Sequence, residues 1–236
     1  MSRILITRPL EDAEALAARL ATLGHAVLIE PLLEIRHFDH ALPDLNEFQA
    51  LLFTSANGVR ALVRGSVARD IPVFSVGKAT ADTAIHAGFP NVSSADGDVE
   101  ALARLVIGRC RPEAGPLLQI AASERAGDLA GRLEAAGFAV RRDVRYEARP
   151  ATALTPALTA ALAAGEVDAA LLFSPRTALA LARLLAVAGL AESGRSVTAV
   201  CLSAAVAAAA AEIPWKAVRV AARPDQEALL AVLAAR

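Results

Sequence analysis

The side chains in this sequence best suited to chemistry are hydroxyl and cationic groups that follow short apolar runs. If those runs are strands of an open parallel sheet, the side chains lie beyond the carboxyl ends of the strands, where such sheets bind ligands. Helices begin at the same places, and their free N–H groups suit carboxylates. The sequence therefore predicts a set of anion sites. Its members are Thr7, Arg8, Thr54, Ser55, Lys78, Thr80, Ser123, Arg125, Ser174, Arg176 and Ser203.

Each of these residues also has a plainer explanation. A serine or threonine before a helix commonly serves as its N-cap, and charges such as those of Lys78 and Arg176 are frequent at helix starts on a protein surface. Tyr146, the one tyrosine in the chain, is open to two interpretations. Its phenol can donate a proton in general acid catalysis, or its ring can simply pack.

Other kinds of chemistry have no motif in the sequence. The four histidines lack the spacing of metal ligands, so no metal site is expected; they are His25, His37, His40 and His86. The first apolar run is followed by residues 7–10 (TRPL) and not by the glycine-rich turn of a dinucleotide site. A G-x-S-x-G nucleophile elbow is also missing.

Two other groups of residues are interpreted as structural. Residues 96–98 (DGD) predict a turn followed by an acidic N-cap for a helix over residues 99–107. Cys110 and Cys201 lie in apolar surroundings. They are interpreted as buried thiols, not as a disulfide or a nucleophile.

Composition narrows the class of protein. The chain has 236 residues, of which 55% are hydrophobic and only 4% aromatic, and its net charge is −1. This length fits one large or two small domains. The low aromatic content argues against stacking on single-stranded nucleic acid, and the small net charge gives no attraction to DNA or anionic membranes. No signal-peptide segment precedes the first apolar run, and the longest apolar stretch, 199–211, is too short for a bilayer. We expect a cytoplasmic protein.

The sequence contains an internal repeat of about half the chain. Four landmarks recur in the same order. In the first copy they are residues 4–9 (with 24–27), 51–55, 73–77 and 98–102. Their counterparts in the second copy are residues 117–122 (with 137–140), 171–175, 199–203 and 225–229. A duplicated unit predicts two similar lobes, and a cleft between lobes is a common ligand site.

Strands and helices alternate along the chain. Short apolar runs predict buried parallel strands at residues 4–6, 26–30, 50–54, 73–76, 91–93, 117–120, 140–145, 169–173, 198–202 and 217–220. Helical periodicity lies between them, for example over residues 10–23 and 128–136. This order predicts an α/β protein with a doubly wound parallel sheet in each lobe.

Two segments depart from that pattern. Residues 32–38 and 144–150 alternate apolar and polar side chains, which indicates two half-exposed strands that pair with each other. The predicted organisation is then a discontinuous lobe of residues 1–33 and 151–236, a two-stranded linker of 34–39 and 144–150, and a second lobe of 40–143. Two independent lobes divided near residue 114 remain the alternative.

An ordered set of motifs now points to a family. The motifs are residues 4–9 (ILITRP), 30–35 (EPLLEI), 52–59 (LFTSANGV), 75–81 (SVGKATA), 144–147 (VRYE), 173–175 (FSP) and 202–203 (LS). Over essentially the whole chain this set resembles the uroporphyrinogen-III synthases. The resemblance implies two α/β lobes joined by a two-stranded ladder, with one lobe built from both ends of the chain.

The resemblance also implies a reaction. These enzymes convert the linear tetrapyrrole hydroxymethylbilane to uroporphyrinogen III: a hydroxyl leaves as water, an azafulvene cation forms, and the last ring attacks to give a spiro intermediate and closes inverted. The pyrroles supply the electrons, so no metal or cofactor is implied. The strand-end groups would bind the substrate's carboxylates, and Tyr146 aligns with a family tyrosine proposed to assist loss of water. A monomer is expected, with a transient contact to the enzyme that makes hydroxymethylbilane and none to nucleic acid or membrane.

Two other classes of function stay open from the residues alone. One is a two-lobed glycosyltransferase that binds a nucleotide-sugar, although a glycine-rich loop and an acid to bind the ribose are not clearly present. The other is a ligand-binding module without catalysis. Tyr146 favours an enzyme over a binding module.

Overall fold

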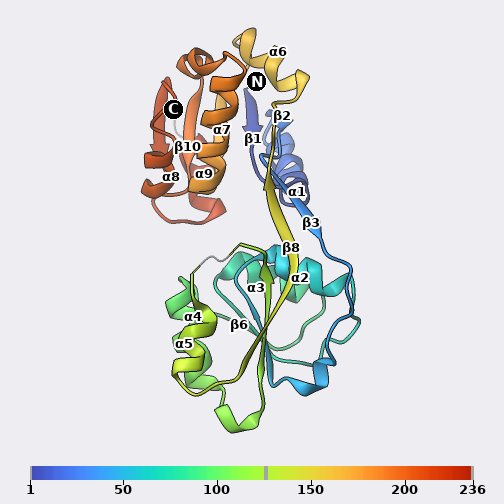
Figure 1. Ribbon diagram of the computed structural model, residues 1–236. Coiled ribbons are helices and arrows are strands. Elements are labelled where there is room, and N and C mark those ends of the chain that lie inside the picture. The colour runs from blue at the N-terminus through green and yellow to red at the C-terminus, as the bar shows by residue number, and fades with distance from the viewer. Residues whose placement is uncertain (1, 125–126, 235–236) are drawn as a thin grey trace. The chain divides into compact units, whose positions relative to one another are not determined.

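The chain forms two compact units in the computed structural model, which describes residues 2–124 and 127–234. Unit 1 consists of Met1–Glu34 with Arg149–Arg236, and unit 2 of Ile35–Ala148. Figure 1 shows the blue strand β1 (Arg3–Ile6) in the same unit as the orange and red elements of the C-terminal part. The chain passes from one unit to the other twice, at β3 (Leu33–His37) and at β8 (Val140–Pro150).

Unit 1 contains a five-stranded sheet in the order β11-β10-β9-β1-β2, in which every pair is parallel. The strands besides β1 are β2 (Ala26–Ile29), β9 (Ala169–Leu172), β10 (Thr198–Cys201) and β11 (Ala217–Val220). The helices are α1 (Leu10–Thr22), α6 (Pro156–Ala163), α7 (Pro175–Val187), α8 (Ala204–Ala209) and α9 (Gln226–Ala234), with a 3-10 turn at Ala191–Ser196.

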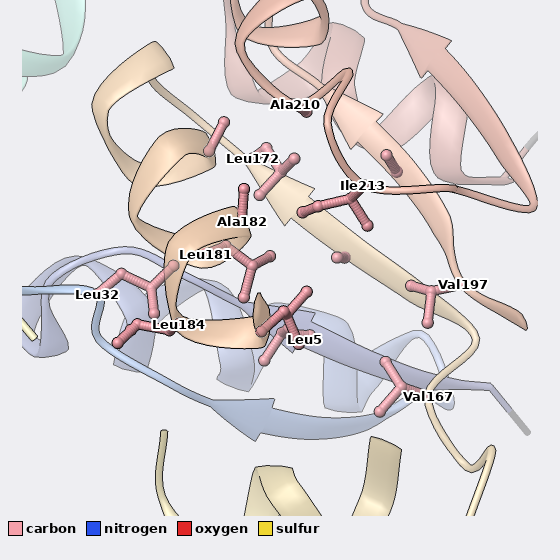
Figure 2. Packing of buried hydrophobic residues seen from close by; sticks show 14 of the residues in the cluster. Leu5, Leu32, Val167, Leu172, Leu181, Ala182, Leu184, Val197, Ala210 and Ile213 are labelled. Carbon is pink, nitrogen blue, oxygen red and sulfur yellow. The ribbon is translucent and has the colours of Figure 1, made fainter. Parts of the chain in front are cut away.

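Helices cover both faces of this sheet because side chains alternate along each strand. Leu5 of β1 points into a cluster with Leu181 and Leu184 of α7, as Figure 2 shows. Its neighbours Ile4 and Ile6 point the other way, into a cluster with residues of α1 and α9. The doubly wound α/β arrangement expected for the sheet therefore has a core on each face.

Unit 2 contains a six-stranded sheet in the order β3-β8-β7-β4-β5-β6. Its remaining strands are β4 (Ala50–Phe53), β5 (Val73–Ser75), β6 (Val92–Ser94) and β7 (Leu117–Ala122). Its helices are α2 (Ala56–Val63), α3 (Lys78–His86), α4 (Val99–Arg109) and α5 (Leu129–Ala135), with 3-10 turns at Leu45–Glu47 and Pro112–Ala114. Helices again cover both faces, since Leu51 and Phe53 pack in one cluster while Ala50 and Leu52 pack in another.

Strands β3 and β8 are neighbours that run in opposite directions. The N–H of Ala151 donates to the carbonyl of Leu32 at 3.0 Å, and the N–H of Phe38 donates to the carbonyl of Arg145 at 2.8 Å. One partner rises in number as the other falls, which is the antiparallel pattern. Strand β8 is longer than expected: the runs 140–145 and 144–150 form one continuous strand, because neither glycine nor proline interrupts them before Pro150.

Helix ends follow the local signals in the sequence. Asp98 caps α4, and its carboxylate accepts from the N–H of Ala101 at 2.8 Å, as expected for the 96–98 turn. Gly24 and Gly137 follow α1 and α5 with φ of 82° and 90°, a conformation that glycine adopts without strain. Within the described ranges, no helix has the length and apolar character needed to cross a bilayer.

Candidate functional site

In unit 1, the predicted residues gather at one edge of the sheet. Thr7 and Arg8 follow β1, Ser174 and Arg176 follow β9, and Ser203 follows β10. These three strands are adjacent and parallel, so their carboxyl ends meet at the same edge. This is the edge at which open α/β sheets bind ligands.

Arg8 is a cation held by several contacts. Its guanidinium lies 4.6 Å from the centre of the Phe173 ring. One nitrogen donates to Oε1 of Gln226 at 3.2 Å, and the other lies 3.4 Å from a carboxylate oxygen of Asp12. The side chain is nevertheless 22% exposed. A guanidinium fixed on an aromatic face and still open to solvent is suited to bind a carboxylate.

The hydroxyl groups of unit 1 already have structural partners. Thr7 is fully buried, and its hydroxyl donates to the carbonyl of Leu171 at 2.8 Å. Ser174 caps α7 in a reciprocal arrangement with Thr177. Ser203 caps α8 by accepting from the N–H of Val206 at 3.4 Å, which leaves its own hydroxyl hydrogen to donate. The N-cap explanation therefore holds for Ser174 and Ser203, whatever else they contact.

In unit 2, the predicted residues again follow adjacent strands. Thr54 and Ser55 come after β4, Lys78 and Thr80 begin α3 after β5, and Ser123 comes after β7. Ser55 caps α2 by accepting from the N–H of Asn57 at 3.2 Å. Arg125, the other residue predicted here, lies outside the described residues.

The two residues at the start of α3 differ in environment. The Lys78 side chain is 79% exposed, and its ammonium lies 2.9 Å from a carboxylate oxygen of Asp82, one turn along the helix. The hydrogen bond that Lys78 donates to Asp82 raises the pKa of Lys78. Thr80 is buried against the unit. Lys78 therefore offers a mobile charge at the surface, and Thr80 contributes chiefly to packing.

Tyr146 is buried in unit 2, with 5% of its surface exposed. Its phenol is hydrogen-bonded with the side chain of Ser55, at the start of α2. Burial raises the pKa of Tyr146, and the hydrogen bond with Ser55 opposes that rise. The phenol is therefore neutral and able to donate its proton over the whole physiological range.

A β-bulge aims this side chain. In the parallel pair of β7 and β8, Ala121 pairs with Val144 but Ala122 pairs with Tyr146, so Arg145 is an extra residue. The register shift interrupts the strict alternation of faces at this point, and both Arg145 and Tyr146 are buried, at 4% and 5% exposure. Bulges re-aim side chains in this way, and they recur beside active sites.

A small cavity of about 50 Å³ adjoins this edge of unit 2. Its lining includes Thr54, Gln119, Asp128 and Arg142. The Arg142 guanidinium donates to the carbonyl of Ala122, the residue paired with Tyr146. Gln119 and Arg142 are not among the residues predicted from the sequence, although a polar residue inside the apolar run 117–120 is a signal of a buried partner or ligand.

The cysteines do not add a nucleophile to either edge. Cys201 is buried at the end of β10, and burial raises the pKa of its thiol to about 11. Burial also raises the pKa of Cys110. Both thiols are therefore protonated near neutrality, where only the thiolate is reactive. Cys201 matches the expectation of a buried thiol, whereas Cys110 is only partly buried.

Comparisons with known proteins show which family and which solved structures this chain resembles. A protein-family model described as uroporphyrinogen-III synthase HemD matches residues 14–231. The crystal structure of uroporphyrinogen-III synthetase from Helicobacter pylori 26695 is similar, with a TM-score of 0.67 and 22% identity over 99% of this chain and 98% of that one. A mutant uroporphyrinogen III synthase from the extremely thermophilic bacterium Thermus thermophilus has a TM-score of 0.55 and 20% identity over 99% and 96% of the two chains. The comparison with curated proteins gave no match.

Proposed function

The chain belongs to the uroporphyrinogen-III synthase family, and we propose that Tyr146 and the strand-end groups of the two units carry out the family's reaction. That reaction closes hydroxymethylbilane to uroporphyrinogen III with loss of water and inversion of the last ring, and it needs no cofactor. The family match confirms the resemblance drawn from the motifs. It also removes the two alternatives, a nucleotide-sugar glycosyltransferase and a binding module without catalysis.

Tyr146 is proposed as the general acid. The leaving hydroxyl of hydroxymethylbilane departs as water when it receives a proton, and the electrons of the pyrrole ring then stabilise the cation that remains. A phenol that is neutral near physiological pH and bonded to Ser55 can supply that proton. This buried, bulge-directed phenol is the observation that carries the proposal.

The carboxylates of the substrate are proposed to contact several weak sites. Arg8 is a cation held on an aromatic ring in unit 1, and Lys78 and Arg176 add charge at the starts of α3 and α7. The first N–H groups of α2 and α3 supply donors beside Ser55 and Gly77. Because the net charge of the chain is −1, attraction for an anion has to come from such local groups.

The setting of the reaction is part of the same proposal. We expect the protein to act in the cytoplasm as a monomer, with the linear tetrapyrrole as its substrate. Hydroxymethylbilane also closes spontaneously to the type I ring, so a transient contact with the enzyme that produces it would shorten its exposure to water.

The decisive experiment supplies freshly generated hydroxymethylbilane and separates the uroporphyrin isomers after oxidation. The type III isomer should predominate with the protein present, and only type I should form without it. The Tyr146→Phe variant is the matched control, since it keeps the ring and removes the acid. Formation of type I alone by the wild-type protein would overturn the proposed function.

A further inference from the structure

A second cluster of charged side chains lies in unit 2 beside the bulge. It consists of His40, in the segment after β3, with Asp143 and Arg145 of β8. Nε2 of His40 lies 2.8 Å from Oδ1 of Asp143, and a terminal nitrogen of Arg145 donates to the backbone carbonyl of His40 at 2.6 Å. The same nitrogen lies 3.8 Å from Oδ2 of Asp143. His40 thus contacts both charged residues, one with its ring and one with its backbone.

Arg145 is held in a confined place. It is 4% exposed, and its Nε is buried without a hydrogen-bond partner. Another terminal nitrogen lies against Gly65, where a Cβ would come within 3.3 Å of it. A buried guanidinium with an unsatisfied donor costs stability, so its retention calls for an explanation other than stability.

The position of Arg145 in the strand supplies that explanation. Arg145 is the extra residue of the bulge, and Tyr146 is the next residue. The segment after β3 holds this residue twice, because the N–H of Phe38 donates to its carbonyl at 2.8 Å and the carbonyl of His40 accepts from its guanidinium. If Arg145 were released and β8 returned to regular pairing, Tyr146 would turn to the opposite face of the sheet, away from Ser55.

We propose that His40 is a positioning residue: through Asp143 and Arg145 it holds the bulge that directs the hydroxyl of Tyr146 toward Ser55. The consequence for turnover rests on the proposed catalytic role of Tyr146, whereas the consequence for its position does not. The His40 side chain is 48% exposed and borders a cavity of about 200 Å³. Replacing the side chain therefore removes the contact with Asp143 without opening the core, and it keeps the backbone carbonyl to which Arg145 donates.

The position of the phenol can be measured directly, because Tyr146 is the one tyrosine in the chain. Isotope-labelled tyrosine gives one ring signal by NMR, and three variants report on it. His40→Ala removes the ring that binds Asp143, His40→Gln can restore a donor at the position of Nε2, and His86→Ala removes an exposed histidine of α3 as the control. We expect the Tyr146 signal to shift or broaden in His40→Ala and to stay near its wild-type position in the other two.

Kinetics provide the second test. In His40→Ala, kcat should fall by about tenfold to a hundredfold with KM unchanged, because the acid is displaced while the anion sites remain. His40→Gln should recover most of this loss. In a Tyr146→Phe background, His40→Ala should cause no further fall in kcat, since its effect acts through the phenol.

Three results would overturn the positioning role. They are a Tyr146 signal in His40→Ala identical to that of the wild type, a shift of equal size in His86→Ala, or kinetic losses of His40→Ala and Tyr146→Phe that multiply. Full activity of Tyr146→Phe would instead refute the catalytic role of the phenol. The NMR comparison would still test whether His40 positions it.

Discussion

The two units carry a buried acid at the same point of the repeat and use it differently. Glu30 lies six residues after Gly24, and Asp143 lies six residues after Gly137. The Glu30 carboxylate accepts from the N–H of Thr155 at 2.8 Å and from its hydroxyl at 2.5 Å. Asp143 is bonded instead to the imidazole of His40.

Each acid bonds a residue in a segment that follows a crossing of the chain: Glu30, just after β2, bonds Thr155, and Asp143, within β8, bonds His40. In unit 1 the partner is Thr155, the N-cap residue of α6, an exposed and neutral residue whose N–H and hydroxyl both donate to the buried Glu30 carboxylate. In unit 2 the partner is a half-exposed histidine, and the strand continues through the bulge to Tyr146. The acid of unit 1 thus has a structural partner only, whereas that of unit 2 lies three residues before Tyr146, the proposed general acid.

The strongest way to break this comparison is to remove the phenol. Tyr146→Phe keeps the ring packed, and turnover should fall by about one to three orders of magnitude, the usual range for a lost general acid. Thermal stability should change little. Steady-state rates with fresh hydroxymethylbilane and a melting curve measure both quantities. Wild-type turnover in this variant would leave Tyr146 as a packing residue and make the two units alike.

The two acids can be compared by matched amide substitutions. Glu30→Gln should lower the free energy of unfolding by about 2 kcal/mol, because a buried carboxylate with two donors loses charge-assisted hydrogen bonds. Asp143→Asn should lower it by about 1 kcal/mol or less, since Asn keeps an acceptor for a partly exposed histidine. Denaturant titrations of both variants measure the difference. Equal losses would show that the two contacts are energetically equivalent.

Substrate binding should also divide between the units. Arg8→Met removes a guanidinium that is already oriented on Phe173, so KM should rise by about tenfold with little change in kcat. Lys78→Met removes an exposed and mobile charge, and KM should rise by less than about threefold. Initial rates at several salt concentrations test this, because added salt should weaken the Lys78 contribution first. A larger rise in KM for Lys78→Met than for Arg8→Met would contradict this prediction.

Single hydroxyl groups should matter least for turnover. Ser174→Ala removes the cap of α7, which should cost about 1 kcal/mol of stability. Its effect on turnover should stay below about tenfold, because neighbouring N–H groups remain for the carboxylates. Ser203→Ala is the companion variant on α8. Complete loss of turnover in a folded serine variant would indicate a discrete nucleophile and end the model of distributed binding.

The smallest expected effect is on the pH dependence of stability, in which the wild type and Tyr146→Phe should differ. Burial raises the pKa of Tyr146, so the folded state favours the neutral phenol. Its contribution is complete below the unfolded pKa of about 10 and is lost as pH rises through the higher folded value. Melting temperatures of wild type and Tyr146→Phe should therefore converge or cross only at alkaline pH. A difference that changes between pH 6 and 8 would contradict this assignment.

Much of the fold could be predicted from the sequence, because local patterns of apolar and polar residues indicate where strands and helices lie. Apart from β8, which joins two predicted runs, apolar runs placed the strands within about a residue or two of their observed ends, the usual uncertainty of such boundaries. The alternating run 32–38 corresponds to β3. The positions of the predicted site residues after the strands followed from the same runs. The bulge did not, since nothing in residues 144–147 (VRYE) distinguishes a regular strand from one with an extra residue. Pairing with β7 decides it, and pairing is a long-range property.

The side-chain clusters were hidden for a related reason. His40 and Asp143 are far apart in sequence, and neither is unusual where it stands. Thr7 follows the first apolar run like the other hydroxyl residues, yet its hydroxyl bonds Leu171 of a strand from the other half of the chain. A local pattern can place a residue at the end of a strand, but its hydrogen-bond partner is a residue distant in the sequence.

The double crossing between the units also sets an order in time. Unit 2 is one continuous stretch of chain, Ile35–Ala148, so all its residues are made before the second segment of unit 1, Arg149–Arg236. In unit 1, β1 must wait for β9, and Arg8 must wait for Gln226, near the end of the chain. Domains generally fold as they emerge, and contacts between distant segments form late. The unit that holds Tyr146 can thus mature first, while β1 has only β2 to pair with until β9 is made.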